Sequence, residues 1–448
     1  MNIGDYPYFH VVTIIRKTNM SFFNNLPNEL LIMIFNLCDV STLSKISMVC
    51  KKFHGISNMI LHNKTKHLLV TNQKSKKFLE RCKPQLSYIP QFIMNYNWRQ
   101  RIYKDRQIEK FNPKSFLDNR KRLQMTKNMV LLCNKHSLFA YNRANDGTIK
   151  MGKKAKIFSD SPFRDFFYSN NEIISGHEDG SIRHWIIESL TEKNDIKHLR
   201  THYNVHDNIR HIDATLRHII SGSSNSIKIQ KYTYKNSYGK YLEYLEKKRQ
   251  ISYNNEREVQ SMLFDPTGTK FAVSTYTKNP EHLSSLLIYD IDDRDSVIDK
   301  TEDCSNYRYK PGAFQLLWED PHTILICYDS YIKKMDIRTS EFVRTWNCSS
   351  ENNEILTCFT TDKILTCFTT DNLYTIMTGT TNNQVLLWDQ RQNAYIQAYT
   401  TCTRRSIISI EFDSSHLYTV TDKYLCQYDF QERFGFRDRK YILSNFFK

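Results

Sequence analysis

The chain has 448 residues, of which 40% are hydrophobic, 13% aromatic and 25% charged, a composition typical of folded domains and inconsistent with a disordered chain. This length predicts more than one domain. The net charge is +16, the 11 cysteines show no C-x-x-C pair or zinc-finger spacing, and no apolar run reaches the roughly 18 residues that span a bilayer. We therefore expect no disulfide framework, no metal site, no cofactor and no membrane contact, and we expect the protein in the cytoplasm, the nucleus or both.

Residues 26–53 read LPNELLIMIFNLCDVSTLSKISMVCKKF and have the pattern of three short helices. Pro27 suits the start of a helix, either Asp39 or Ser41 can cap a second one, and Cys50 begins an apolar face that continues into a third. The first helix carries apolar residues at helical spacing, namely Leu26, Leu30, Ile34 and Leu37. About forty residues cannot bury every apolar face by themselves, so part of this surface is expected to meet a partner or the following domain.

This stretch resembles the F-box, whose pattern LPxELLxxIFxxLDxxxLxxxxxVCKxF it follows closely from Leu26 to Phe53. The resemblance implies a domain over residues 23–63 that docks on the adaptor Skp1 and, through it, on cullin-1 and its RING subunit. The residues that it implies for the Skp1 contact or for the three-helix core are Leu26, Pro27, Leu30, Ile34, Leu43, Val49, Cys50 and Phe53. Many F-boxes carry a Trp near the end of the third helix, where this chain has Ile60-Leu61-His62. The alternative is an ordinary helical hairpin buried in the protein.

Most of the positive charge lies in residues 51–122, where 18 Lys and Arg face four acidic residues. Such a block can bind phosphate backbones or an acidic protein surface, or it can be a solvated helical stalk. Apolar residues that suit packing interrupt it, among them Phe78, Trp98 and Phe111, and they favour the stalk over nucleic acid. We predict a basic helical linker over residues 64–118, with a break between two helices at residues 84–90.

A repeat organises residues 119–433. The clearest unit, 163–188, reads as three short strands joined by tight turns and ends near Trp185. Comparable units end at Tyr141, Gln230, Tyr289, Met335, Trp388 and Tyr428. The intervals between the seven positions are 44, 45, 59, 46, 53 and 40 residues, close to the period of four-stranded propeller blades.

Two of these intervals are long. The interval of 59 contains a charged, Tyr-rich stretch at 234–257, which we interpret as a loop between blades. The interval of 53 contains a tandem duplication, ILTCFTTDK at 355–363 followed by ILTCFTTDN at 364–372, so that one copy is surplus to the period. If that copy is real, we expect it in a bulge or an extra loop.

The repeat units resemble WD40 repeats through the Ser-Gly before a turn, the Asp-Gly within it and the Trp that follows, although most units are degenerate. The predicted fold is therefore an α+β multidomain one, with a three-helix F-box and helical stalk before an all-β, seven-bladed WD40-type propeller. Residues 1–22 are expected to be an N-terminal extension and 434–448 a tail.

The combination resembles the F-box/WD-repeat proteins, and segment 95–111 resembles the Trp-containing basic stretch of one member. The resemblance implies a substrate-recognition subunit of a Skp1-cullin-F-box ubiquitin ligase, whose propeller binds a protein substrate, phosphorylated or unmodified. No P-loop, G-x-S-x-G or H-E-x-x-H motif occurs, so neither catalytic residues nor an enzyme activity are predicted. Two alternatives stay open: a receptor for another cullin adaptor, on the W-D-x-R pattern at 388–391 and a near match at 335–338, and an RNA-associated scaffold that uses the basic stalk.

Four basic residues near the starts of strands are the candidate substrate site. Arg164 opens the first strand of one predicted blade, Arg183 opens the third strand of the same blade, and Arg210 opens the first strand of the next, with Lys228 close by. Phosphopeptide-binding members of the family place arginines at such positions, and Arg forms bidentate contacts with phosphate. The hypothesis requires arginines that converge without carboxylate partners.

Overall fold

The computed structural model describes residues 23, 25–83, 85–111, 123–187, 196–203, 208–237, 240–253, 257–277, 284–293, 296–302, 312–348 and 364–431. These residues form two compact units. A helical unit contains the described residues up to Asn72 together with Leu86–Gln100, and a propeller unit contains Gln73–Gln85 and Arg101–Gln431. The predicted N-terminal extension and C-terminal tail lie outside the described residues.

The helical unit is built on three helices of the F-box-like segment and one later helix. They are α3 (Asn28–Asn36), α4 (Val40–Ile46), α5 (Lys51–Thr65) and α7 (Tyr88–Gln100). Asp39 caps α4, because its Oδ1 accepts a hydrogen bond of 2.7 Å from the backbone N–H of Thr42. One core joins all four helices, since Phe92 of α7 belongs to the same buried cluster as Leu31, Phe35 and Phe53.

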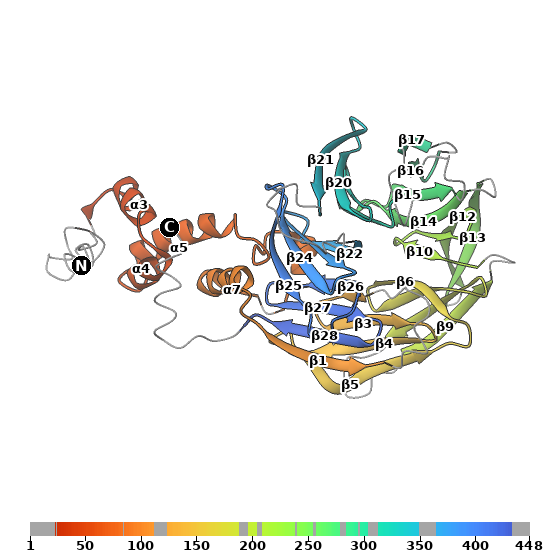
Figure 1. Ribbon diagram of the computed structural model, residues 1–448, viewed down its shortest axis with the longest axis horizontal. Coiled ribbons are helices and arrows are strands. Elements are labelled where there is room, and N and C mark those ends of the chain that lie inside the picture. The colour runs from red at the N-terminus through yellow and green to blue at the C-terminus, as the bar shows by residue number, and fades with distance from the viewer. Residues whose placement is uncertain are drawn as a thin grey trace, which may run out of the picture. The chain divides into compact units, whose positions relative to one another are not determined.

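The propeller consists of seven four-stranded antiparallel sheets, or blades (Figure 1). Blade 1 is β2 (Leu123–Met125), β3 (Met129–Asn134), β4 (Ser137–Arg143) and β5 (Ile149–Phe158). Blade 2 is β6 (Phe163–Ser169), β7 (Glu172–His177), β8 (Ser181–Ile187) and β9 (Ile196–Tyr203). Blade 3 is β10 (His211–Ala214), β11 (His218–Gly222), β12 (Ser226–Ser237) and β13 (Lys240–Ser252).

The remaining blades follow in chain order around the ring. Blade 4 is β14 (Arg257–Phe264), β15 (Lys270–Thr277), β16 (Ser284–Asp290) and β17 (Ser296–Glu302). Blade 5 is β18 (Gln315–Asp320), β19 (Thr323–Cys327), β20 (Tyr331–Asp336) and β21 (Glu341–Asn347). Blade 6 is β22 (Leu365–Thr370), β23 (Thr375–Thr380), β24 (Gln384–Asp389) and β25 (Tyr395–Thr400). Blade 7 is β26 (Ile407–Phe412), β27 (His416–Thr421), β28 (Tyr424–Asp429) and β1 (Lys104–Lys110).

The seven-fold period is confirmed, because each of the seven predicted positions lies in the third strand of its own sheet. These strands are β4, β8, β12, β16, β20, β24 and β28. In the first six blades the register between the third and fourth strands shifts at or next to that position. A bulge therefore recurs with the sequence period, and it twists each outer strand relative to the inner three.

The ring is closed by a strand from the N-terminal side of the chain. β1 pairs antiparallel with β28, from Lys104 opposite Asp429 to Lys110 opposite Tyr424. The prediction of a helical linker over residues 64–118 is wrong for this segment, which is a propeller strand. The physical reason is the open edge that three C-terminal strands leave in blade 7, whose unpaired backbone groups the extended segment β1 covers.

Hydrogen bonds join the first strand of each blade to the first strand of the next at all seven junctions. Typical examples are the backbone N–H of Ile212 donating to Asp165 Oδ2 at 3.2 Å, and that of Phe264 donating to Asp213 Oδ2 at 2.7 Å. The other junctions are Leu123–Ser409, Gln124–Tyr168, Leu263–Trp318, Gln315–Phe368 and Thr366–Ile407. The inner strands are thus held in one continuous ring.

Two further expectations concern the long intervals. Most of segment 234–257 is not an inter-blade loop but the end of a long hairpin, in which β12 and β13 pair as far as Ser237 opposite Lys240. Its Tyr content suits paired strands, and the blade extends outward. In the duplication, the second copy supplies β22, whereas the first copy, 355–363, lies outside the described residues.

Candidate functional site

Helix α3 carries apolar residues on two faces. Leu31 and Phe35 are almost fully buried in the helical core. Leu30, Met33 and Leu37 are 46%, 66% and 75% exposed, and their spacing places them on one face of the helix. A folded helix thus presents a row of large apolar side chains to solvent, which soluble surfaces rarely do without a partner.

Both ends of α3 are fixed to α5 by lysines. Lys52 Nζ donates to the carbonyl of Leu26 at 2.7 Å, and Lys64 Nζ donates to the carbonyls of Asn36 and Cys38 at 3.3 and 3.2 Å. Burial lowers the pKa of Lys64, while its position at the C-terminal end of α3 is favourable for a cation. The two lysines hold α3 and α5 side by side, so the exposed face of α3 is presented on a rigid support.

The eight residues implied by the F-box resemblance divide into three groups. Leu43 and Phe53 are 0% and 4% exposed and belong to the three-helix core, which is one of the two roles that the resemblance implies. Three of the others are half-buried against that core, namely Leu26, Ile34 and Cys50. The exposed ones are Pro27, Leu30 and Val49.

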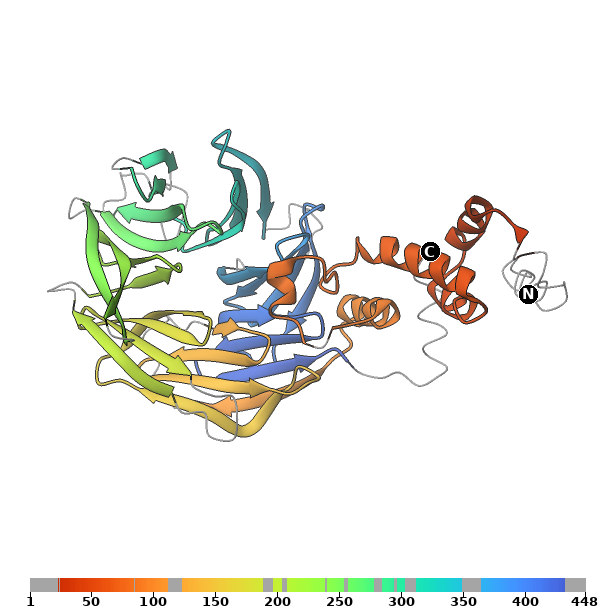
Figure 2. The ribbon, with the colours of Figure 1, turned by 180° about the vertical axis from the view of Figure 1, so that it is seen from behind.

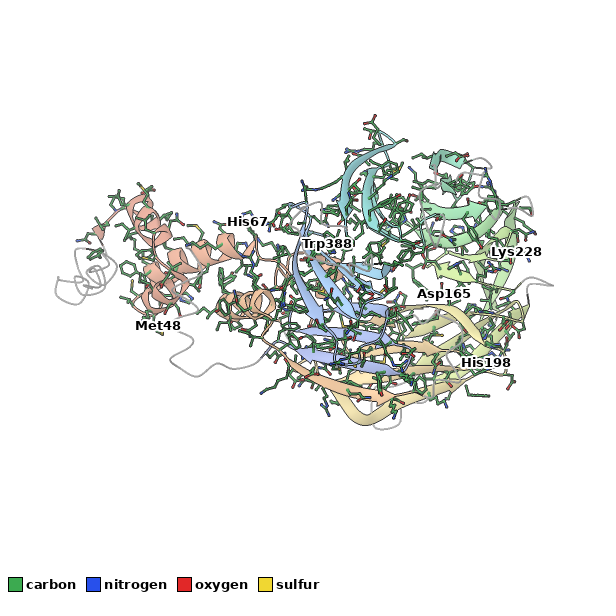
Figure 3. All side chains as sticks on the ribbon, in the orientation of Figure 1. Met48, His67, Asp165, His198, Lys228 and Trp388 are labelled. Atoms are coloured by element: carbon green, nitrogen blue, oxygen red, sulfur yellow. The ribbon has the colours of Figure 1, made fainter. Side chains whose placement is uncertain are left out.

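The structure adds exposed apolar residues that were not among these eight. Met33 and Leu37 continue the exposed face of Leu30, and Met48, which is 77% exposed, adjoins Val49 after α4 (Figure 3). The available signal was their spacing: Met33 and Leu37 stand three and seven residues after Leu30. The sequence does not show which side of α3 packs into the core, because both sides of the helix are apolar.

On the propeller, two of the candidate arginines lie in blade 2 and each has a carboxylate partner. Arg164 Nη2 is 2.7 Å from Glu178 Oε1, and Arg183 Nη2 is 3.1 Å from Asp179 Oδ2. Arg183 Nη1 also donates to Ser159 Oγ at 2.9 Å. Both guanidinium groups are therefore neutralised by the turn between β7 and β8.

The third arginine, which directly precedes β10 of blade 3, also has a carboxylate partner, on β14 of blade 4. Arg210 Nη1 is 2.6 Å from Glu258 Oε2, which also accepts a hydrogen bond of 2.6 Å from the hydroxyl of Tyr276. Lys228 is half-buried on β12 (Figure 3). The phosphate-site hypothesis required unpaired arginines, so we drop it for Arg164, Arg183, Arg210 and Lys228.

The W-D-x-R pattern is also engaged internally. Arg391 donates to both carboxylate oxygens of Asp389 at 2.8 Å, and its guanidinium lies 4.5 Å from the ring centre of Tyr374. Arg338 forms the same two-point contact with Asp336. Each arginine closes a turn within its own blade. These internal contacts give no support to the alternative in which the two arginines bind another cullin adaptor.

The segment Gln73–Gln85, which contains α6 (Lys76–Leu79), packs on blades 6, 7 and 1. Arg81 Nη1 is 2.8 Å from Glu411 Oε2, and its Nη2 donates to the carbonyl of Thr370 at 2.6 Å. Phe78 is fully buried, with its ring centre 5.3 Å from that of Phe412. Figure 2 shows this short helix beside the blue strands of the last blades. This part of the predicted linker is therefore an integral piece of the propeller.

A buried ion pair anchors this segment. Arg143 and Asp413, both 0% exposed, join blade 1 to blade 7, and Arg143 Nη1 also donates to the carbonyl of Arg81 at 2.7 Å. Burial opposes the charged form of Asp413, but Arg143 and its other partners hold its pKa at about 2. Gly147 permits the close approach of chain segments here, because its φ is +94° and a Cβ would collide with the carbonyl of Lys83.

Two further observations concern membrane-spanning helices and metal-binding clusters among the described residues. No helix in the part of the chain that the structure describes is both long and apolar enough to cross a membrane. Across the described ranges, no three His, Cys, Asp or Glu side chains gather in an arrangement that could hold a metal ion.

Comparisons with known proteins agree with these two units. The model of the F-box-like family matches residues 23–64. Over 425 residues the chain is 24% identical to F-box/WD repeat-containing protein 4 of Homo sapiens, covering 91% of this chain and 92% of that protein. The chain thus combines an F-box-like domain with a WD40-type propeller, as F-box/WD-repeat proteins do.

Two solved structures were compared with this chain by superposition. A chain of the crystal structure of the Mitotic Checkpoint Complex superposes with a TM-score of 0.53 at 13% identity, over 72% of this chain and 94% of that one. The crystal structure of the WD40 beta propeller domain of Doa1 gives 0.46 at 14% identity, over 68% and 90%. At this identity the first likeness indicates the fold alone.

Proposed function

We propose that this protein is the substrate-recognition subunit of a Skp1-cullin-F-box ubiquitin ligase. The observation that carries the proposal is the exposed apolar face of α3, Leu30, Met33 and Leu37, on a helical unit that matches the F-box-like family. Docking on Skp1 would remove this face from water, and each fully buried Leu or Met contributes roughly 1.5–3 kcal/mol. Skp1 would in turn link the chain to cullin-1 and its RING subunit.

In this role the propeller holds a protein substrate and the chain itself catalyses nothing. Ubiquitin transfer belongs to a separate conjugating enzyme, and the receptor raises the local concentration of the substrate beside it. Such a ligase subunit would act in the cytoplasm or the nucleus and lead its substrate to the proteasome.

The test is the affinity of the full chain for purified Skp1. In a Met33→Glu/Leu37→Glu variant, two carboxylates would have to be desolvated in the contact, so we expect the affinity to fall at least about tenfold for each substitution. The matched control is Leu199→Glu/Val343→Glu, which makes the same change at propeller residues that are 50% and 58% exposed. This control should bind Skp1 like the unmodified chain.

Circular dichroism of both variants checks that the helices and strands are intact. A folded Met33→Glu/Leu37→Glu variant with unchanged Skp1 affinity would contradict the proposal. So would an unmodified chain that shows no binding to Skp1 at all.

A further inference from the structure

Two thiols lie in contact at the junction of blades 6 and 7. Cys402 belongs to the turn that connects β25 with β26, and Cys426 lies in β28. Their Sγ atoms are 3.8 Å apart, although the two residues are 24 positions apart in the chain. The nine cysteines among the described residues are all free thiols, so this pair is in its reduced form.

The turn that carries Cys402 is held against one face of β28. The backbone N–H of Cys402 donates to the hydroxyl of Tyr428 at 3.4 Å, and Cys402 Sγ is 3.8 Å from the same oxygen. Cys426 and Tyr428 are two positions apart in a strand, so both side chains point to the same face of the blade. A hydrogen bond of the backbone therefore fixes the turn in the position that brings the two sulfur atoms together.

The two thiols differ in their access to solvent. Among the described cysteines, Cys402 is the exposed one, whereas Cys426 is fully buried. Burial raises the pKa of the Cys426 thiol, which keeps it protonated and unreactive toward dissolved reagents. A small reagent from solution thus reaches Cys402 first, with the sulfur of Cys426 directly behind it.

We propose that Cys402 and Cys426 are a site of reversible oxidation, which forms a disulfide when the protein meets hydrogen peroxide. Shortening the separation of the sulfur atoms from 3.8 Å to the roughly 2.05 Å of an S–S bond is a small movement of the exposed turn. The proposal rests on the geometry of this pair and is independent of the ligase function proposed above.

The oxidation takes two steps. The thiolate of Cys402 attacks one oxygen of hydrogen peroxide, the O–O bond breaks, the departing oxygen leaves as water, and Cys402 becomes a sulfenic acid. The sulfur of Cys426 then attacks the sulfur of Cys402, the S–O bond breaks, and the hydroxyl leaves as a second water with the proton of Cys426. Two thiols lose two electrons and one peroxide is reduced to two water molecules. A dithiol reverses the reaction by thiol–disulfide exchange.

The disulfide acts on the strand that closes the ring. Cys426 pairs with Thr419 of β27 on one side and with Gln107 of β1 on the other, so β28 carries the closing strand β1. The new bond ties β28 to the connection between blades 6 and 7. Because a disulfide restricts the unfolded chain, the oxidised propeller should be more stable than the reduced one.

Mass spectrometry of the full chain tests for the bond. Reduced protein is treated with hydrogen peroxide, its remaining thiols are blocked with N-ethylmaleimide in denaturant, and it is digested with trypsin without reduction. Cleavage after Lys and Arg places Cys402 on the peptide 392–404 and Cys426 on the peptide 424–433, each with a single cysteine. We expect the two peptides joined after peroxide, and separate and blocked when dithiothreitol follows the peroxide. Cys402 found only as an oxidised monomeric thiol, or joined to a different cysteine, would overturn the proposal.

Thermal unfolding of variants shows whether the bond acts on the ring. In the unmodified chain, peroxide should raise the melting temperature of the propeller by about 5 °C, and dithiothreitol should reverse the rise. Cys402→Ser, at an exposed position that leaves the core intact, should abolish the rise, and so should Cys426→Ser. The matched control is Cys38→Ser in the helical unit, which should keep it. A rise that persists in Cys402→Ser would overturn the proposal, and so would an unmodified chain whose melting temperature does not respond to peroxide.

Discussion

The helical unit and the propeller bury their large apolar side chains to different degrees. In α3, Leu31 is buried and its neighbour Leu30 is 46% exposed, so the helix has one apolar face inside and one outside. In the propeller, the large side chains Trp318, Trp346 and Trp388 are buried, and Trp388 also donates to Thr378 Oγ1 at 3.0 Å (Figure 3). The helical unit thus leaves an apolar face exposed, whereas the blades of the ring bury these large apolar side chains against one another.

The difference follows from size and closure. A few short helices have too little interior to bury every apolar face. Seven blades shield one another, and β1 covers the last open edge. The following predictions test this contrast, from the largest expected effect to the smallest.

Arg143→Ala should destabilise the propeller by about 3–5 kcal/mol, because it leaves the carboxylate of Asp413 buried without its guanidinium partner. Calorimetry should show a lower melting temperature for the propeller. The control is Arg391→Ala, whose pair with Asp389 is partly exposed and should contribute about 1 kcal/mol or less. Equal melting temperatures for the two variants would mean that Arg143 does not hold the ring.

Gln107→Pro should weaken the closure of the ring, because Gln107 pairs with Cys426 and proline interrupts a strand ladder. We expect a destabilisation of about 3 kcal/mol, together with faster hydrogen exchange in β28. Lys110→Ala, at the end of the same strand, is the control. Unchanged exchange in β28 of the proline variant would contradict the closing role of β1.

Acid should weaken blade 2 through its buried histidines. Burial lowers the pKa of His177 to about 4 and that of His184 to about 3, below the ordinary value of 6.5. The unfolded chain binds more protons than the folded one between about pH 6.5 and 4, so stability falls as the pH is lowered through this range, by about 2 kcal/mol for each histidine at pH 5.

This pH effect is measured as the difference in free energy of unfolding between pH 7 and pH 5. The difference should shrink in His177→Gln and in His184→Gln, and it should not change in the control His62→Gln, an exposed residue of α5. An equal pH effect in all three variants would place its origin elsewhere.

Leu37→Ser should have the smallest effect on stability, within about 0.5 kcal/mol, because Leu37 is 75% exposed. Leu31→Ala is its buried counterpart on the same helix and should cost about 2–5 kcal/mol. Chemical denaturation monitored by circular dichroism at 222 nm follows the helices. A loss above 1 kcal/mol for Leu37→Ser would show that this face is already packed within the protein.

Local patterns in the sequence were sufficient for several features of the fold. Asp39 caps α4 as one of two predicted candidates, and the seven periodic positions from Tyr141 to Tyr428 lie in third strands. Both features depend on residues close together in the chain: a cap acts within one helical turn, and a blade is built from neighbouring strands joined by short turns.

Only the tertiary structure decided the features that join distant segments. β1 pairs with β28 across more than 300 residues, Arg143 meets Asp413, and Arg210 meets Glu258. Tertiary packing also decides which side of α3 enters the core. Leu30 and Leu31 are identical in chemistry and differ only in what packs against them. No local spacing determines such contacts, since they depend on where the fold brings remote parts of the chain together. For that reason the sequence did not reveal the carboxylate partners of the candidate arginines, which rule out the phosphate site.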